Sequence, residues 1–458
     1  MFERANQRLP PGKWLPPHSA TRSRGSITLD PPLTRFSGLQ LAPNQPPTKA
    51  PESRRFFALD SLRALMMLLG IYLHGVVGYS AGASDTDWPF KDPHPTAIFD
   101  WTIGYIHAFR MPVFYVIAGF FAALLIDRRG ARSFLRNRVQ RILVPFVVGW
   151  TLLFPMVFLL AVYSRVADEP HAWNQACQSI LSLEFVRHRH PLHLWFLEYL
   201  LLFYMAQAAA ILILPRVLPP RALLVGNSMF RWVVKCPWKP LILAVPMFLV
   251  LSMTRYGSVE TPQGFFPAVR ILLPYSITFL FGWLLFENVD LLDELQRGAL
   301  TQVALTFGVV VLIVPIAPWL DLHRTPARFI VAAATSLLMW LMICGLTGVF
   351  LRYLNRPLPR MRYLADSSYW LYLIHMVALM ALQILLRPVP WPAALKAWVV
   401  LVLAVPVMLL SYHYCVRPTV IGQILNGRRY PTWSRSAKNG QSAAFAPLLP
   451  PGVSGRRP

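Results

Sequence analysis

Residues 57–74 read FALDSLRALMMLLGIYLH, an apolar stretch that carries Arg63 near its start and His74 at its end. The run is long enough to form most of a transmembrane helix, because a bilayer core requires about 20 predominantly apolar residues. On an α-helix, residues eleven positions apart face the same way and lie about 16 Å apart along the axis. The stretch therefore predicts a membrane helix with two interpretations. Arg63 is either an anchor that snorkels to the interface, with His74 an interfacial residue, or the two form a buried stripe that faces one internal passage, where the cation binds an anion and the base moves a proton.

Nine more apolar spans follow, so the sequence predicts an all-α polytopic membrane protein with about ten transmembrane helices. The ten spans are residues 57–79, 98–126, 139–163, 194–214, 240–255, 267–286, 299–317, 327–350, 363–386 and 393–415. The span at 240–255 is short for a crossing. It is retained because basic loops on the cytoplasmic side must be separated by even numbers of helices. We therefore expect both termini in the cytoplasm.

The composition excludes a soluble protein. Charged residues make up 14% of the 458 positions, whereas a typical soluble protein has about a quarter. The 44 Lys and Arg residues outnumber the 20 Asp and Glu residues, and they fall in alternate loops, as the positive-inside rule requires. Because they form no single patch, nucleic acid is excluded as a partner, and membrane lipids are the expected surroundings. The four cysteines show no paired spacing, and we expect no metal.

Two polar segments flank the apolar region. Residues 1–55 are rich in Pro, Ser and Arg, and residues 417–458 are mostly polar and basic. Residues 1–55 have no periodic apolar pattern, and both segments are expected to be disordered basic tails in the cytoplasm. The membrane domain is then expected at residues 56–416.

Ionisable residues inside the spans are the main indication of function, because inserting each of them into a membrane near a helix centre costs roughly 2.5–3.5 kcal/mol. Asp60 precedes Arg63 by three residues and can pair with it. His107 and Arg110 share a face near the middle of the second span. For Arg110 we expect a buried partner or a bound anion, and Asp60 and Glu198 are the candidate partners.

Four further positions are open to two interpretations each. Arg138 and Arg141 lie side by side at the start of the third span, as a phosphate-binding pair or as ordinary positive-inside residues. His193 is either an interfacial residue beside a tryptophan or part of a site. His375 is either a histidine satisfied between helices or a functional group.

Five of these stretches together resemble the acyltransferase-3 family of membrane acyltransferases. They are Arg63-x10-His74, FRMPVFYVIAGF at 109–120, Arg138-x-x-Arg141, HLWFL at 193–197 and YLIH at 372–375. The resemblance covers about residues 57–415. The LDSLRA start at 59–64, together with HLWFL, is most similar to the branch that substitutes periplasmic glucans.

The resemblance implies a multi-pass enzyme of the bacterial inner membrane that takes an acyl group, succinyl in this branch, from cytoplasmic acyl-CoA. The acceptors would be hydroxyls of osmoregulated periplasmic glucans, and no permanently bound cofactor is implied. His74 would be the catalytic histidine, and Arg63, paired with Asp60, would hold the donor side. Arg138 and Arg141 would line the CoA entrance.

Acyl transfer of this kind needs further groups. The oxyanion requires a hydrogen-bond donor, for which Arg110 or His107 is the candidate. A succinyl carboxylate requires a cation, for which Arg110 or Arg270 would serve. The candidates on the acceptor side are His193, Glu198 and His375.

Two alternatives stay open at this stage. The first is an O-acetyltransferase that acts on another cell-envelope polysaccharide. The second is an ion-coupled transporter or flippase, because intramembrane His, Arg and Glu residues also suit coupled transport.

Overall fold

The computed structural model describes residues 56–83, 88–187, 190–316, 325–427 and 429–430. These residues form helices joined by loops. Their only extended pairing is one isolated parallel β-bridge between Ser80 and Thr96. The prediction of an all-α protein is therefore confirmed for the described part of the chain. The predicted tail at 1–55, and residues 431–458 of the other tail, lie outside the described residues.

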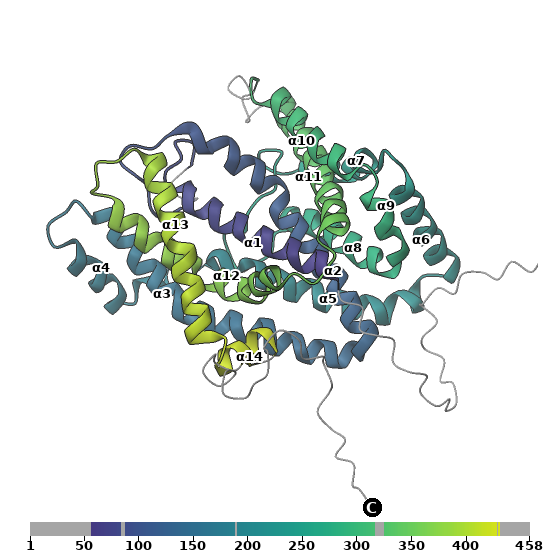
Figure 1. Cartoon of the computed structure of the whole chain (residues 1–458), viewed down its shortest axis with the longest axis horizontal. Coiled ribbons are helices and arrows are strands. Elements are labelled where there is room, and N and C mark those ends of the chain that lie inside the picture. Colours follow the sequence, from purple (N-terminus) through teal and green to yellow (C-terminus); the bar gives the residue numbers. More distant parts are fainter. Residues whose placement is uncertain (1–55, 84–87, 188–189, 317–324, 428, 431–458) are drawn as a thin grey trace, which may run out of the picture. The chain divides into compact units, whose positions relative to one another are not determined.

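All ten predicted spans overlap helices (Figure 1). These helices are α1 (Phe57–Val77), α2 (Asp100–Arg138), α3 (Val144–Val166), α5 (Trp195–Val217), α7 (Lys239–Leu251), α8 (Val269–Glu287), α10 (Ala299–Ile313), α11 (Thr325–Tyr353), α12 (Pro359–Leu386) and α13 (Ala393–Ser411). Four other helices were not predicted: α4 (Ala172–Leu181), α6 (Pro220–Lys235), α9 (Leu292–Gln296) and α14 (Val420–Asn426).

Not every helix is long enough to cross a bilayer by itself. Seven helical segments of the described residues have the required length and apolar composition, or eight if the bent pair Val289–Gln296 and Ala299–Ile313 is one span. One of the seven, Ala97–Val166, contains two predicted spans and runs through a π-helical segment, η3 (Val139–Leu143). Helix α7 has 13 residues. The polytopic membrane character is thus supported, whereas the number ten and the side of the termini remain predictions.

The C-terminal end of the helical part extends further than predicted. Helix α14 lies inside 417–458, so the prediction of disorder is wrong for this stretch. Arg141 donates from Nε to Ile424 O (3.4 Å) and from Nη2 to Leu425 O (3.2 Å). These bonds satisfy carbonyls that a helix end leaves without partners. The helix then stops at Gly427, which has a left-handed φ of 75°.

Helices α2 and α8 make the most extensive contact of any helix pair described. A Cβ placed on Gly119 of α2 would overlap the carbonyl oxygen of Phe279, and a Cβ on Gly282 of α8 would overlap that of Val116. Small residues at such positions let membrane helices approach closely and gain packing energy. Helix α8 thus covers one face of α2. Helix α1 packs against α2, α11, α12 and α13.

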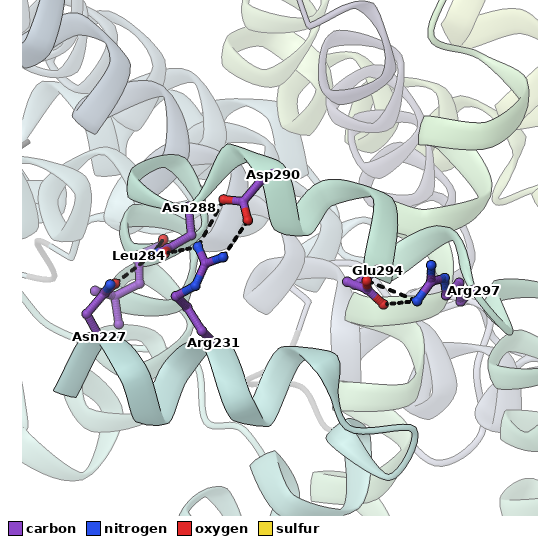
Figure 2. A network of polar contacts seen from close by, with 7 residues as sticks. All are labelled: Asn227, Arg231, Leu284, Asn288, Asp290, Glu294 and Arg297. Carbon is purple, nitrogen blue, oxygen red and sulfur yellow. Dashed lines mark hydrogen bonds and ion pairs between the residues drawn. The ribbon is translucent and has the colours of Figure 1, made fainter. Parts of the chain in front are cut away.

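Helix α6 is attached to the protein through its polar face (Figure 2). Arg231 donates to both carboxylate oxygens of Asp290 (3.0 and 2.6 Å) and to Asn288 Oδ1 (2.8 Å). Asn288 Nδ2 in turn donates to Asn227 Oδ1 (2.8 Å). The opposite face exposes three large apolar side chains, Val225, Met229 and Trp232. A helix with this arrangement is typical of the membrane–water interface.

The glycine contact predicts a stability effect. We expect Gly282→Ala to lower the free energy of unfolding by about 1–3 kcal/mol, because the added methyl group forces α2 and α8 apart. Thermal unfolding in detergent measures the change. Gly308→Ala in α10 is the matched control, since a Cβ there meets open space. Equal melting temperatures for the two variants would contradict the proposed packing role.

Candidate active site

A cavity of about 520 Å³ lies between α1, α2, α12 and the loop residues at 80–83, 88–89, 190–193 and 258–263. Most of its ionisable lining residues are histidines. The ionisable lining residues are His74, His107, His190, His193, His375, Arg110, Asp100 and Tyr372. The structure therefore brings together five of the predicted site residues from four separate segments of the chain.

The cavity lies toward one end of the bundle. Its lining includes Ser80 and Gly82, which follow α1, and Asp100 and Gly104 near the start of α2. The arginine-rich segments lie at the opposite ends of these helices. The cavity therefore lies at the end of these helices away from the arginine-rich segments.

His74 is placed on α1 with one ring nitrogen toward the cavity. Its ring stacks on Trp88 with the centroids 5.1 Å apart, and the ring of His375 lies 5.2 Å away. Its Nδ1 is buried and has no hydrogen-bond partner among the described residues. This leaves Nε2 as the nitrogen that is accessible from the cavity.

The backbone at His74 is held by α12. Gln383 Nε2 donates to His74 O (3.3 Å) and to Gly75 O (3.1 Å). The Gln383 Oε1 atom accepts a hydrogen bond from Trp88 Nε1 (2.8 Å). One amide side chain therefore fixes both the last turn of α1 and the indole that stacks on the His74 ring.

Helix α12 also orients the two neighbouring histidines. His375 Nδ1 donates to Tyr372 O (2.7 Å), and His193 Nε2 donates to Leu373 O (3.1 Å). The two rings lie 4.8 Å apart. Because carbonyls only accept, the remaining nitrogens, His375 Nε2 and His193 Nδ1, carry lone pairs in the neutral rings. Despite this clustering, no three His, Cys, Asp or Glu side chains of the described residues are arranged to hold a metal ion.

Arg110 reaches from α2 to α1. The atoms nearest to a Cβ on Gly70 would all belong to the Arg110 side chain, so this guanidinium lies against the α1 backbone. The predicted partners are wrong, because Arg110 forms no ion pair with Asp60 or Glu198. Asp60 lies beside Arg63 instead, and Glu198 does not line the cavity.

The predicted pairing of Asp60 with Arg63 is observed, with Oδ1 and Nη2 3.6 Å apart. Arg63 Nη2 also donates to Ala365 O (3.1 Å). The lining of the cavity on α1 stops at Met67, however, and does not include Arg63. The expectation that Arg63 and His74 face one passage is therefore wrong for this structure. Helical spacing aligned the two side chains, but the α12 carbonyl binds the guanidinium between the helices.

Arginines gather near the other ends of these helices. Arg141 lies close enough to Arg138, Arg129 and Arg63 for the positive charges of these side chains to repel its own. The Arg138 guanidinium packs over the ring of Tyr204 at 5.4 Å. None of the four lines the cavity. The structure thus separates a histidine-lined cavity from a cationic cluster, and CoA binding at Arg138 and Arg141 remains a prediction.

Much of the chain is similar in sequence to known proteins. Residues 56–413 match the sequence pattern of a family described as an acyltransferase domain. This chain belongs to the acyltransferase-3 family. Proteins named glucans biosynthesis protein C from Salmonella paratyphi B, Salmonella heidelberg and Salmonella agona are each 33% identical to it over 152 residues. That match covers 33% of this chain and 37% of each relative. No solved structure matches the chain.

Sequence reasoning missed a buried ion pair that supports the site of this acyltransferase. Lys396 Nζ lies 2.9 Å from Asp92 Oδ2, and the two side chains are 3% and 1% exposed. Asp92 N also donates to Gly78 O (2.9 Å). The pair ties the loop that carries Trp88 to α13. The available signal was the single lysine in the apolar span 393–415.

A second ion pair near this loop is at the surface. Arg387 donates to both carboxylate oxygens of Asp168 at 2.6 Å each. These hydrogen bonds hold the pKa of the Asp168 carboxyl below its ordinary value. Because Asp168 is 80% exposed, we expect this pair to matter little for stability.

Breaking the buried pair should be costly. Lys396→Met leaves the Asp92 carboxylate buried without its counter-charge, so we expect a loss of about 3–5 kcal/mol of stability. The double variant Lys396→Met, Asp92→Asn should recover most of this loss. Unfolding of the single and double variants in detergent measures both effects. Lys91→Met, which removes an exposed lysine, is the control, and a Lys396→Met variant as stable as this control would refute the prediction.

Proposed function

We propose that this protein is a membrane O-acyltransferase that moves a succinyl group from cytoplasmic succinyl-CoA to hydroxyls of osmoregulated periplasmic glucans. Membership of the acyltransferase-3 family supports acyl transfer. The similarity to glucans biosynthesis protein C supports a glucan acceptor. The observation that carries the proposal is the position of His74, whose Nε2 faces a cavity at the end of the bundle that we assign to the periplasm.

In the proposed reaction His74 is the general base. An acceptor hydroxyl that enters the cavity gives its proton to Nε2 while its oxygen attacks the thioester carbonyl. The C–O bond forms and the C–S bond breaks as the tetrahedral intermediate collapses. The proton then passes from His74 to the departing CoA thiolate, so the imidazole returns to its neutral form. The stacking of Trp88 holds the ring in place for both transfers.

The acceptor would bind among the other cavity residues. His193 and His375 are oriented by α12 carbonyls, and His107 Nε2 donates to Val259 O (2.9 Å). Rings held in this way form a rigid polar wall next to His74. A sugar with several hydroxyls suits such a wall, because it both donates and accepts hydrogen bonds.

The donor would enter from the cationic end. CoA carries several phosphate charges, and arginine forks suit phosphates. The cluster of Arg63, Arg129, Arg138 and Arg141 provides this charge. Since the cavity stops at Met67 on α1, the proposal requires side chains between Met67 and Arg63 to move when the thioester enters.

The role of His74 predicts a loss of activity without a loss of fold. We expect His74→Gln to lower acyl transfer by about 10²–10⁴-fold, the usual contribution of a general base. Mass analysis of periplasmic glucans and transfer by purified protein from labelled succinyl-CoA measure it. His413→Gln, outside the cavity, is the control. Normal glucan substitution by a well-expressed His74→Gln protein would rule out this role, and substrate flux without any acyl-CoA would indicate transport.

The donor side has its own test. Arg138→Gln should raise KM for acyl-CoA about tenfold with little change in kcat, because one charge-assisted contact to a phosphate is lost. Arg216→Gln removes an exposed arginine elsewhere and is the matched control. An unchanged KM for Arg138→Gln would show that Arg138 does not bind CoA and is an ordinary positive-inside residue.

A further inference from the structure

The cavity contains one permanent cation that the proposed reaction does not neutralise. Among the described residues, no carboxylate pairs with Arg110, and its Nε is buried without a hydrogen-bond partner. The one carboxylate that lines the cavity, Asp100, already accepts hydrogen bonds from Ser80 Oγ and from Gly82 N (3.3 Å). The other ionisable lining residues are histidines and a tyrosine. Burial of an unpaired cation is unfavourable, so the cavity is built for an anionic ligand group.

Gly70 determines where the Arg110 guanidinium lies along α1. A side chain on Gly70 would collide with the Arg110 guanidinium, so only glycine lets the group lie against α1. Gly70 precedes His74 by four residues, which places it on the same face and about 6 Å further along the axis toward Arg63. The guanidinium therefore lies about one helical turn deeper than the proposed base, on the side from which the donor would come.

Three anions of the proposed reaction are candidates for this position. The CoA phosphates are separated from the thioester by the long pantetheine arm, and the arginine cluster already lies at the donor end. The oxyanion forms at the carbon attacked beside His74, which requires a donor level with the imidazole. A carboxylate two methylene groups beyond that carbon reaches about one turn further, to the level of Gly70. A guanidinium fork binds such a carboxylate through two parallel hydrogen bonds.

We propose that Arg110, seated against Gly70, is the specificity-determining subsite that binds the free carboxylate of a dicarboxylic acyl group. The enzyme would then select succinyl over uncharged acyl groups of the same length. This inference rests on the proposed function, which supplies the acyl donor and the base.

The experiment compares two donors that differ only in charge and terminal group. Purified full-length protein in lipid nanodiscs is given succinyl-CoA or butyryl-CoA with a glucan acceptor, and kcat/KM is measured for each. The wild-type protein should prefer succinyl-CoA by at least tenfold. Arg110→Met should lose about 100-fold with succinyl-CoA, as expected for a charged hydrogen-bonded contact, and should keep or gain activity with butyryl-CoA. Arg216→Met is the control and should keep the wild-type preference.

Each result separates this inference from the proposed function. An equal loss with both donors in Arg110→Met would identify an oxyanion or CoA contact and overturn the carboxylate subsite. A wild-type protein that uses butyryl-CoA as well as succinyl-CoA would overturn it too, while acyl transfer itself would stand. Transfer from neither donor would instead remove the proposed function.

A measurement without an arginine substitution covers the case in which Arg110→Met does not fold. Gly70→Ala keeps the charge but displaces the guanidinium. We expect this variant to reduce the preference for succinyl-CoA over butyryl-CoA by about tenfold. An unchanged preference in a folded Gly70→Ala protein would contradict the subsite, as would a wild-type protein without a preference.

Discussion

The position of His74 depends on the hydrogen bonds that Gln383 makes at the end of α1. The last carbonyls of a helix have no partners within it, and in a membrane they find few outside the protein. Gln383 satisfies two of them and holds Trp88 at the same time. The buried pair of Asp92 and Lys396 then fixes the loop that delivers Trp88. Without these contacts the imidazole would have neither a fixed backbone nor a stacked ring.

Charge is divided between the two ends of the bundle. The cationic cluster lies where the chain carries its arginine-rich segments, and the histidine-lined cavity lies toward the other end. Arg110 is the exception, since it is a cation inside the cavity at the level of Gly70. This distribution suits the proposed reaction, in which the donor is polyanionic and the acceptor is a neutral sugar with many hydroxyls.

The apolar spans were predictable because each must exclude unpaired polar groups from lipid over about 20 residues. The helices that were missed are amphipathic or short, such as α6, whose polar face is satisfied by Asp290 and Asn288 rather than by water. The site was predictable in part. His74, His107, His193 and His375 meet in one cavity. This was expected, because inserting an ionisable side chain into lipid costs free energy and such residues therefore face the interior of the bundle. Lys396 was overlooked because its partner, Asp92, lies more than 300 positions away in the chain.

The sequence by itself determined the class of the protein, the places of its long apolar helices and the residues too polar to lie in lipid without a role. Those properties depend on local composition and on periodicity along the chain. The pairing of Asp60 with Arg63 within one helix was predictable, but only the tertiary structure decided what each polar residue meets on other helices: Arg63 binds an α12 carbonyl, and Arg110 lies without a carboxylate partner over Gly70. The reason is physical, since helical spacing specifies the direction of a side chain, whereas the neighbouring helix at that depth specifies what it meets.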